Sequence, residues 1–186
     1  PAQERLWFLD RLAPGSSAYV MPLALRFRGG IEPGRVEAAL IAVEARHPVL
    51  RRRLADGPAL REVPSAPFVL PVLHGDAALV QRRALAPFDL STEPFWRACL
   101  VRLPDGDAVL VLTVHHLVAD GISMGVLLND LGRALAGEPL PPHTGPSYGA
   151  LAAVRRAQLA APDSQAALLR QAARLNEANE ALLANS

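Results

Sequence analysis

Two apolar runs joined by a short turn constrain the fold of this chain more than any other feature. The runs FWRACLVRL (95–103) and AVLVLTVHH (108–116) flank the tetrapeptide Pro-Asp-Gly-Asp, which favours a tight turn between two strands. Both runs are almost continuously apolar, and such runs bounded by turn residues are typical of buried strands. We therefore predict a β-hairpin with buried strands.

Helical and extended patterns alternate along the rest of the chain. Apolar residues recur at helical spacing in some segments and at alternate positions in others, with Pro and Gly at the boundaries. The patterns predict helices at 1–13, 35–47, 76–85 and 122–135, and strands at 19–28, 49–54 and 67–73. Two further helical stretches follow a Pro- and Gly-rich connection at 137–147. The alternation predicts an α/β fold, a two-layer sandwich.

Composition and charge exclude several classes of protein. The chain has 186 residues, enough for one domain or one lobe of a larger one, and 51% of its residues are hydrophobic. The formal net charge is +1 and the arginines are scattered, so we expect no nucleic-acid binding. No apolar run approaches the roughly 18 residues of a membrane span. Cys99 is the single cysteine, which rules out an internal disulfide and suits a reducing cytoplasm.

The stretch TVHHLVADGIS (113–123) places two adjacent histidines at the predicted end of the second hairpin strand. Successive side chains of a strand point to opposite faces, so His115 and His116 are expected to diverge. Divergent side chains are poor ligands for one metal ion, and the other histidines (47, 74 and 143) lack ligand spacing. We therefore expect no metal site.

A hydrolase interpretation starts from GISMG (121–125), which matches the nucleophile-elbow pattern G-x-S-x-G around Ser123. In an α/β-hydrolase this serine is followed by an acid and then by a histidine. Only His143 follows here, in a Pro-rich segment, and no further strand is predicted beyond it. The pattern therefore gives weak support to a hydrolase.

Two interpretations of the histidine pair remain open from the residues alone. In the first, one histidine faces a cavity and transfers protons near neutral pH, while Asp120 either caps the next helix or pairs with an arginine. Gly121 then allows a tight backbone where a substrate passes. In the second, both histidines are satisfied core residues that precede an ordinary Asp-Gly turn. This stretch by itself does not decide between them.

Three separated stretches resemble the first three core motifs of nonribosomal peptide synthetase condensation domains. They are AQERLWFL (2–9), RHPVLR (46–51) and VHHLVADGIS (114–123). The resemblance covers roughly residues 1–160 and implies a chloramphenicol-acetyltransferase-like fold, of which the chain matches only the N-terminal lobe. The fourth motif is degenerate at best, with Tyr148 kept and Ala150 where an acid is usual.

The expected domain limits follow from the same resemblance. We assign residues 1–175 to the N-terminal lobe of a condensation domain and residues 176–186 to a helical tail that matches nothing in the family. The sequence starts at Pro1 inside a helical pattern, from which we expect a piece of a longer protein.

The resemblance also implies roles for individual residues. The second histidine of the third motif is the family's active-site residue, which corresponds to His116, and His115 is then structural. Asp120 and Arg46 match positions that pair in the family, so an ion pair is expected to tie a helix end to the active-site turn. Removing one partner of such a pair, when it is buried, costs about 3–5 kcal/mol. Gly121 belongs to the same structural support.

The activity that the resemblance implies is acyl transfer. The family forms an amide between a donor acyl or peptidyl thioester and the amine of an acceptor aminoacyl thioester, both attached through 4′-phosphopantetheine to peptidyl carrier proteins. No bound cofactor or metal is implied. The expected partners are the carrier proteins, the adjacent synthetase domains and the missing C-terminal lobe. Met124 stands where epimerization domains usually have tryptophan, which favours a peptide-bond-forming domain with L-configured donors.

Two alternatives to this function are kept. In the first alternative, the chain, which lacks the second lobe, is a non-catalytic lobe that binds a carrier protein. In the second it belongs to a related acyltransferase with the same HHxxxDG motif, which forms esters or amides on a free acceptor. We expect the fragment alone to be inactive without the C-terminal lobe, and its location to be cytoplasmic.

Overall fold

The computed structural model describes residues 7–9, 11–12, 15–54, 60–64 and 67–142, together with residues 145, 154 and 157. The chain divides into two compact units, Pro1–His143 and Thr144–Ser186. Of the helical stretches predicted after residue 147, only residues 154 and 157 are described, and both are helical. His143, Tyr148 and the domain boundary expected at residue 175 lie outside the described residues, so these assignments stay predictions.

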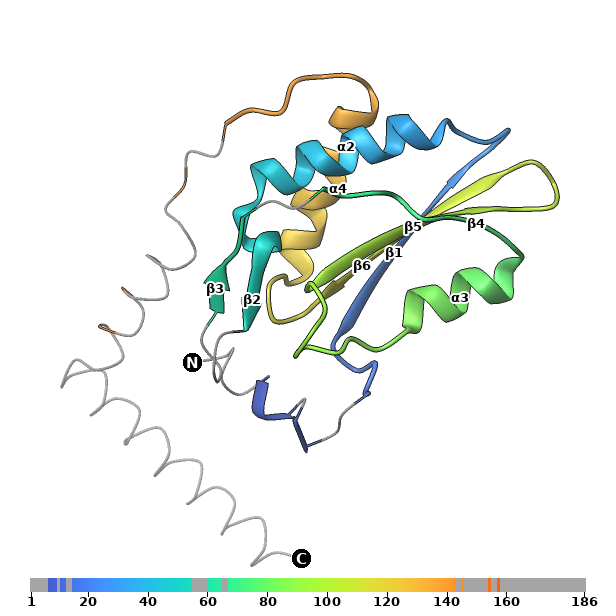
Figure 1. Cartoon of the computed structure of the whole chain (residues 1–186). Coiled ribbons are helices and arrows are strands. Elements are labelled where there is room, and N and C mark those ends of the chain that lie inside the picture. Colours follow the sequence, from blue (N-terminus) through green and yellow to red (C-terminus); the bar gives the residue numbers. More distant parts are fainter. Residues whose placement is uncertain are drawn as a thin grey trace, which may run out of the picture. The chain divides into compact units, whose positions relative to one another are not determined.

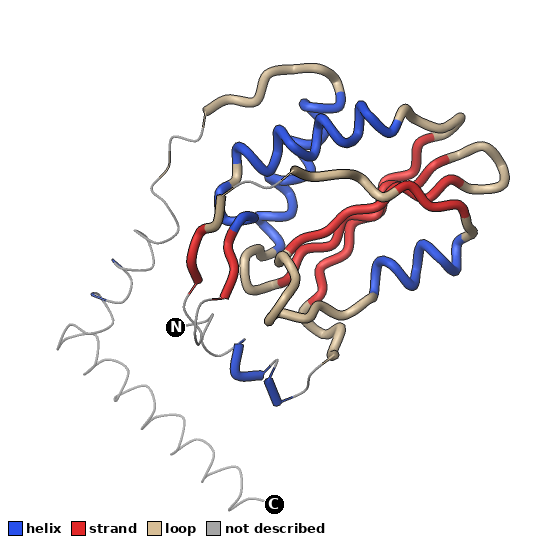
Figure 2. The backbone as a smooth tube through the Cα atoms, in the orientation of Figure 1, coloured by secondary structure: helices blue, strands red, loops and turns tan. Residues whose placement is uncertain are grey.

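A four-stranded sheet forms the centre of the first unit (Figure 1, Figure 2). The strands, in the spatial order β1-β6-β5-β4, are β1 (Val20–Phe27), β6 (Ala108–His115), β5 (Trp96–Arg102) and β4 (Val72–His74). β6 pairs antiparallel with both of its neighbours, whereas β4 runs parallel to β5. The predicted hairpin of β5 and β6 is confirmed. Gly106 in its turn has a φ of 86°, a conformation that favours glycine.

Helices cover both faces of this sheet (Figure 1). They are α2 (Pro33–Arg46), α3 (Ala77–Leu85) and α4 (Gly121–Leu135), and a short 3-10 helix, η1 (Pro48–Arg51), follows α2. α2 begins at Pro33, where a missing N–H is tolerated, and ends before Pro48. The predicted α/β fold is confirmed, and α3 adds cover on the second face of the sheet. Among the described residues, no helix has the length and apolar character that a membrane span requires.

Alternation along β5 and β6 divides the buried side chains between the two faces. One hydrophobic cluster includes Leu100 and Leu112 and continues into α2 and α4. The other includes Cys99 and Val111 and packs against Leu79 of α3. Because both faces are covered, every residue of β6 is buried, which accounts for its continuously apolar sequence.

The segment 67–73, predicted as one strand, forms β4 only from Val72 onward. Before it, the Leu70 N–H donates to the Glu37 carboxylate of α2 at 2.7 Å, so this part of the chain is bound to a helix. Pro71 has no N–H to give to a neighbouring strand. The prediction of a strand is therefore wrong for residues 67–71.

The strand predicted at 49–54 is also shorter than expected. η1 occupies its first residues, and the strand β2 spans only Arg52–Leu54. β2 pairs with β3 (Leu60–Glu62), which the sequence patterns did not predict. Three paired residues are too few for a pattern to be recognised from sequence.

Candidate active site

The end of β6 and the turn after it carry the two adjacent histidines. The N–H of His115 donates to the Phe95 carbonyl at 2.7 Å, next to the start of β5. The N–H of His116 donates to the Tyr19 carbonyl at 2.9 Å, next to the start of β1. The Val118 N–H then closes a turn on the His115 carbonyl at 3.1 Å. The backbone of the histidine pair is therefore held by chain segments on both sides of β6.

The two imidazoles lie in different surroundings, because His115 is the last residue of the buried strand β6 and His116 lies just past its end. His115 is 2% exposed. His116 is exposed, and it is the single exposed residue between Ala108 and Ala119. This arrangement fits a structural His115 and an accessible His116. The catalytic role of His116 stays a prediction.

Aromatic rings surround the imidazole of His115. Phe88 meets it edge-on with ring centroids 5.7 Å apart, and the rings of Tyr19 and Phe95 lie at 6.2 and 6.4 Å. Burial, and to a lesser degree the neighbouring His116, lowers the pKa of His115 to about 4. His115 is therefore neutral at pH 7.

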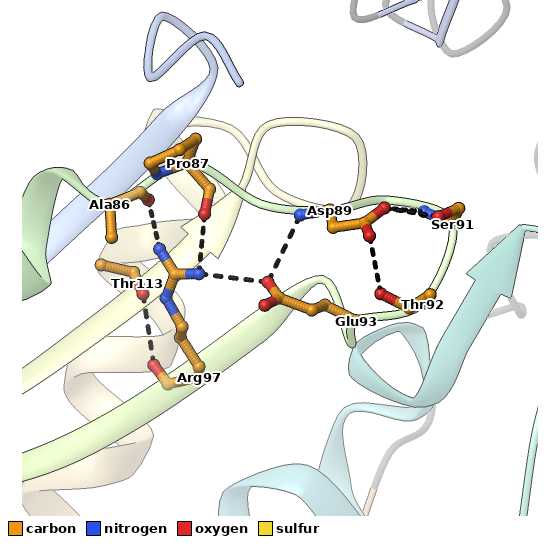
Figure 3. A network of polar contacts seen from close by, with 8 residues as sticks. All are labelled: Ala86, Pro87, Asp89, Ser91, Thr92, Glu93, Arg97 and Thr113. Atoms are coloured by element: carbon orange, nitrogen blue, oxygen red, sulfur yellow. Dashed lines mark hydrogen bonds and ion pairs between the residues drawn. The ribbon is translucent and has the colours of Figure 1, made fainter. Parts of the chain in front are cut away.

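Arg97 of β5 holds the loop that supplies Phe88 (Figure 3). Its guanidinium donates to the carbonyl of Ala86, to the carbonyl of Pro87 at 3.0 Å and to the Glu93 carboxylate at 3.2 Å. The same guanidinium stacks over Phe88, with Cζ 4.1 Å from the ring centroid. Arg97 thus keeps an apolar ring against the buried histidine.

Asp89 lies in the same loop, residues 86–95, which contains no helix or strand. Its carboxylate accepts the Ser91 hydroxyl, the Ser91 N–H at 3.0 Å and the Thr92 hydroxyl at 2.9 Å (Figure 3). These hydrogen bonds, led by that of the Ser91 hydroxyl, lower the pKa of Asp89. The loop is therefore stabilised by its own side chains as well as by Arg97.

Asp120 caps α4, which is one of the two roles that the sequence left open. Its Oδ1 accepts the hydroxyl of Ser123 at 2.7 Å and the backbone N–H of Ser123 at 2.8 Å. The hydroxyl, then the N–H, hold the pKa of Asp120 below its ordinary value, and His116 lowers it further. The carboxylate is therefore charged at neutral pH, at the start of the helix that follows the histidine turn.

The expected ion pair between Arg46 and Asp120 is wrong. Arg46 instead donates through Nε to Oδ2 of Asp130 at 2.8 Å, and through another nitrogen to the Pro141 carbonyl. α2 and α4 pack against each other and cross in Figure 1. Arg46 at the end of α2 therefore meets the middle of α4 and not its first turn. The cost of about 3–5 kcal/mol for breaking a buried pair therefore applies to Asp130.

Asp130 is a buried residue that the sequence interpretation missed. It is 3% exposed, and its Oδ2 also lies 2.7 Å from Nε2 of His47. Burial raises the pKa of this carboxyl, but the hydrogen bonds from His47 and Arg46 outweigh burial and hold the pKa below its ordinary value. The sequence contained an indication of this burial, because Asp130 falls between Leu127 and Leu131 on the side of α4 that is buried. A buried acid requires a partner.

The conformation of Gly121 does not require a glycine. It is the exposed first residue of α4, its φ is not positive, and an added Cβ meets nothing within 4 Å. No contact or conformation within the described residues requires glycine here, and the expected role of Gly121 beside a passing substrate stays a prediction.

Ser123 does not occupy a nucleophile elbow. It lies in the first turn of α4, and its hydroxyl donates to Asp120. β6 ends at His115, well before the serine, and no non-glycine residue among the described ones has a positive φ. An elbow serine sits directly after a strand on a sharp, strained turn. The hydrolase interpretation is therefore not supported.

Comparison with known proteins places this geometry in a family. The family model described as Condensation domain matches residues 1–169. This chain belongs to the condensation domain family. Its fold is accordingly the chloramphenicol-acetyltransferase-like fold of condensation domains.

Individual relatives show how much of a condensation domain is present. Cyclosporin synthetase simA of Tolypocladium inflatum is 40% identical over 159 residues, which are 78% of this chain and 1% of the synthetase. The X-domain from teicoplanin biosynthesis, in its complex with OxyB, is 31% identical with a TM-score of 0.68, over 79% of this chain and 35% of that one. The starter condensation domain of rhizomide synthetase RzmA is 22% identical with a TM-score of 0.70, over 86% of this chain and 43% of that one. The chain therefore spans less than half of these solved domains and corresponds to their N-terminal region.

The substitution Asp120→Ala is expected to lower the free energy of unfolding by about 1 kcal/mol, the usual cost of a lost N-cap. The loss is small because the side chain is exposed and its hydrogen bonds from Ser123 are those of a helix cap. Urea denaturation of this condensation-domain chain measures it. The control is Asp120→Asn, which keeps a capping oxygen and should differ by only a few tenths of a kcal/mol. A loss of about 3 kcal/mol or more would instead indicate a broken buried pair.

The stability of the chain is expected to fall as the pH is lowered from about 6.5 to about 4. The pKa of His115 is 6.5 at its ordinary value and about 4 in the folded chain. In this range the unfolded chain binds a proton that the folded chain excludes, so stability decreases with falling pH. The decrease amounts to about 2–3 kcal/mol and is nearly complete at pH 4. Urea titrations at a series of pH values measure it.

His115→Asn is the variant that tests this assignment, and His74→Asn, at an exposed strand end, is its matched control. His115→Asn should flatten the pH dependence of the free energy of unfolding between pH 6.5 and 4, and His74→Asn should leave it unchanged. Aspartates with lowered pKa values, such as Asp76 and Asp89, lose their contribution in a lower range, below their ordinary pKa of 3.8. A dependence that is the same in His115→Asn as in the unsubstituted chain would contradict the burial of a neutral imidazole.

Proposed function

We propose that this chain forms the N-terminal lobe of a peptide-bond-forming condensation domain of a nonribosomal peptide synthetase. The complete domain joins a donor acyl or peptidyl thioester to the amine of an acceptor aminoacyl thioester, both delivered by peptidyl carrier proteins. The observation that carries the proposal is the exposed His116, which stands between a buried strand and a buried turn in a chain of this family. The adjacent synthetase domains and the C-terminal lobe are the further partners.

The chemistry assigned to the site is a single acyl transfer. The acceptor amine attacks the thioester carbonyl carbon, the C–S bond breaks, and the thiol of the donor's pantetheine arm leaves with a proton. His116 either accepts the proton that the amine loses or orients the amine and stabilises the charged intermediate. The N-terminus of α4, which begins at Gly121, lies close in the chain to the histidine and suits developing negative charge. No metal or bound cofactor takes part in this proposal.

The test is amide formation between two loaded carrier proteins. The full-length condensation domain that contains this chain is mixed with a donor and an acceptor carrier protein from its own synthetase, and the product is measured by mass spectrometry. We expect an amide with the full-length domain and none with the 186-residue chain alone. A folded full-length domain that forms no amide from loaded carriers would reject the catalytic proposal. Location in the cytoplasm stays a prediction.

A second candidate is a lobe that binds a protein without turnover. The observation that favours it is the 31% identity to the teicoplanin X-domain, whose structure is a complex with OxyB, against 22% to the starter condensation domain. A domain that binds carrier or partner proteins in a pull-down but forms no amide would support this candidate. A related acyltransferase, the remaining alternative, would transfer the donor group to a free amine or alcohol with no acceptor carrier present.

A further inference from the structure

A cavity of about 550 Å³ lies at the end of the sheet where β6 begins. The turn after β1 and the turn of the β5–β6 hairpin meet there (Figure 1), so closely that an added Cβ on Gly30 would lie 3.3 Å from the Gly106 carbonyl oxygen. β6 runs from Ala108 at this cavity to His115, a length of about 24 Å. The cavity is therefore separate from the candidate active site, and its volume is in the range of small-molecule pockets.

Arg102 lines this cavity from the end of β5. It continues the alternate residues Ala98 and Leu100, which pack in one cluster with α2, so its side chain leaves the sheet on the face that α2 covers. Unlike these two residues, Arg102 is exposed. Within the described part of the chain, its guanidinium has no hydrogen bond or ion pair. One positive charge of the cavity is therefore without a protein partner.

Glu32 lines the same cavity from the start of α2. It is the exposed N-cap residue of this helix, and its side chain does not form a capping hydrogen bond. Among the residues that the structure describes, no group forms a hydrogen bond or an ion pair with its carboxylate. An acid on α2 and an arginine on β5 thus line one cavity from two elements without pairing with each other.

The second carboxylate of the cavity, that of Asp107, already has its partners. It accepts Nε–H of Arg26 at 2.7 Å and the Gly29 N–H at 2.9 Å. His74, the register neighbour of Arg102 in β4, also lines the cavity, and no role is assigned to it. The cavity is therefore left with one free negative charge, on Glu32, and one free positive charge, on Arg102.

We propose that this cavity binds a small zwitterion, an α-amino acid, with its carboxylate on the Arg102 guanidinium and its ammonium group on the Glu32 carboxylate. A guanidinium binds a carboxylate through two parallel N–H···O bonds. A simple anion would be repelled by Glu32 and a simple cation by Arg102, whereas a zwitterion is attracted by both. The inference goes beyond the proposed function and does not depend on it, because His116 lies past the other end of β6.

A titration of the full-length condensation domain with L-alanine tests the proposal, with the ¹H–¹⁵N signals of Gly30 and Gly106 as reporters of the cavity. We expect saturable shifts with a Kd on the order of 1–10 mM, since both charged side chains are exposed. Propionate and ethylamine each carry one of the two charges, and each should bind about 5-fold more weakly or not at all.

Arg102→Gln and Glu32→Gln should each raise the Kd for L-alanine by about 5-fold, the upper range for an ion pair at an exposed site. Arg61→Gln is the matched control, because Arg61 is an exposed residue of β3 that does not line the cavity, and it should leave the Kd unchanged. An unchanged melting temperature of each variant shows that it is folded.

Three results would overturn the proposal. The first is the absence of a saturable shift at ten times the expected Kd. The second is equal binding of propionate and L-alanine, which would indicate an anion site, and the third is an unchanged Kd in both folded variants. The titration requires no carrier protein and no turnover, so a domain that forms no amide would count against the proposed function and not against this site.

Discussion

Replacement of His116 by alanine is expected to lower kcat for amide formation by about 10²- to 10⁴-fold, the range that general acid–base groups contribute. His116 is exposed, whereas the residues on both sides of it are buried. The substitution therefore removes an accessible imidazole without opening a cavity. Amide formation between loaded carrier proteins by the full-length domain measures the effect.

Two controls make this result specific. His74→Ala changes another exposed histidine, at the end of β4, and should leave kcat unchanged. The free energy of unfolding of His116→Ala should stay within about 0.5 kcal/mol of the unsubstituted domain, as for other surface substitutions. A folded His116→Ala domain with unchanged kcat would remove the residue from its assigned role. His116→Gln distinguishes the two roles considered for His116, because glutamine can orient an amine but cannot serve as a base.

Asp130→Ala is expected to lower the free energy of unfolding by about 3–5 kcal/mol, the cost of breaking a buried ion pair from one side. The substitution leaves the Arg46 guanidinium, whose side chain is only 18% exposed, without its carboxylate, and it removes the partner of His47. It also removes the ion pair that links the end of α2 to α4. Urea or thermal denaturation of the 186-residue chain measures the loss.

Glu138→Ala is the matched control for this prediction. Its carboxylate pairs with Arg133, and both side chains are largely exposed at 55% and 44%, so the expected loss is below about 1 kcal/mol. The double variant Arg46→Met with Asp130→Leu removes both charges and should be more stable than Asp130→Ala, because no unpaired charge remains. A loss for Asp130→Ala as small as that for Glu138→Ala would show that the pair is solvated and contributes little.

Much of the candidate site followed from rules that act over a few residues. The hairpin of β5 and β6 was predictable because its two apolar runs and its turn are contiguous in sequence. The two-residue period of a strand predicted only that His115 and His116 diverge. Both faces of β6 are covered, so the exposure of His116, which lies just past the end of the strand, was decided by the tertiary structure. The cap of α4 by Asp120 was one of two open roles, and its partner, Ser123, is only three residues away.

The errors have a common physical origin. A charged side chain such as Arg46 binds whichever acid the packing of helices brings near, and Asp130 lies 84 residues away in sequence. The loop residue Phe88 covers His115 from a loop that the Arg97 guanidinium binds to the sheet. No local pattern contains such information.

The sequence by itself therefore determined the α/β fold and the hairpin, since each depends on the local geometry of strands, turns and helices. Only the tertiary structure decided that Arg46 pairs with Asp130, that Gly121 is not needed for its conformation, and that aromatic rings surround the His115 imidazole while His116 is exposed. These features depend on which surfaces meet when α2 packs against α4 and the loop before β5 packs on the sheet. The packing of the whole core determines these contacts, so they are not encoded in any short stretch of sequence.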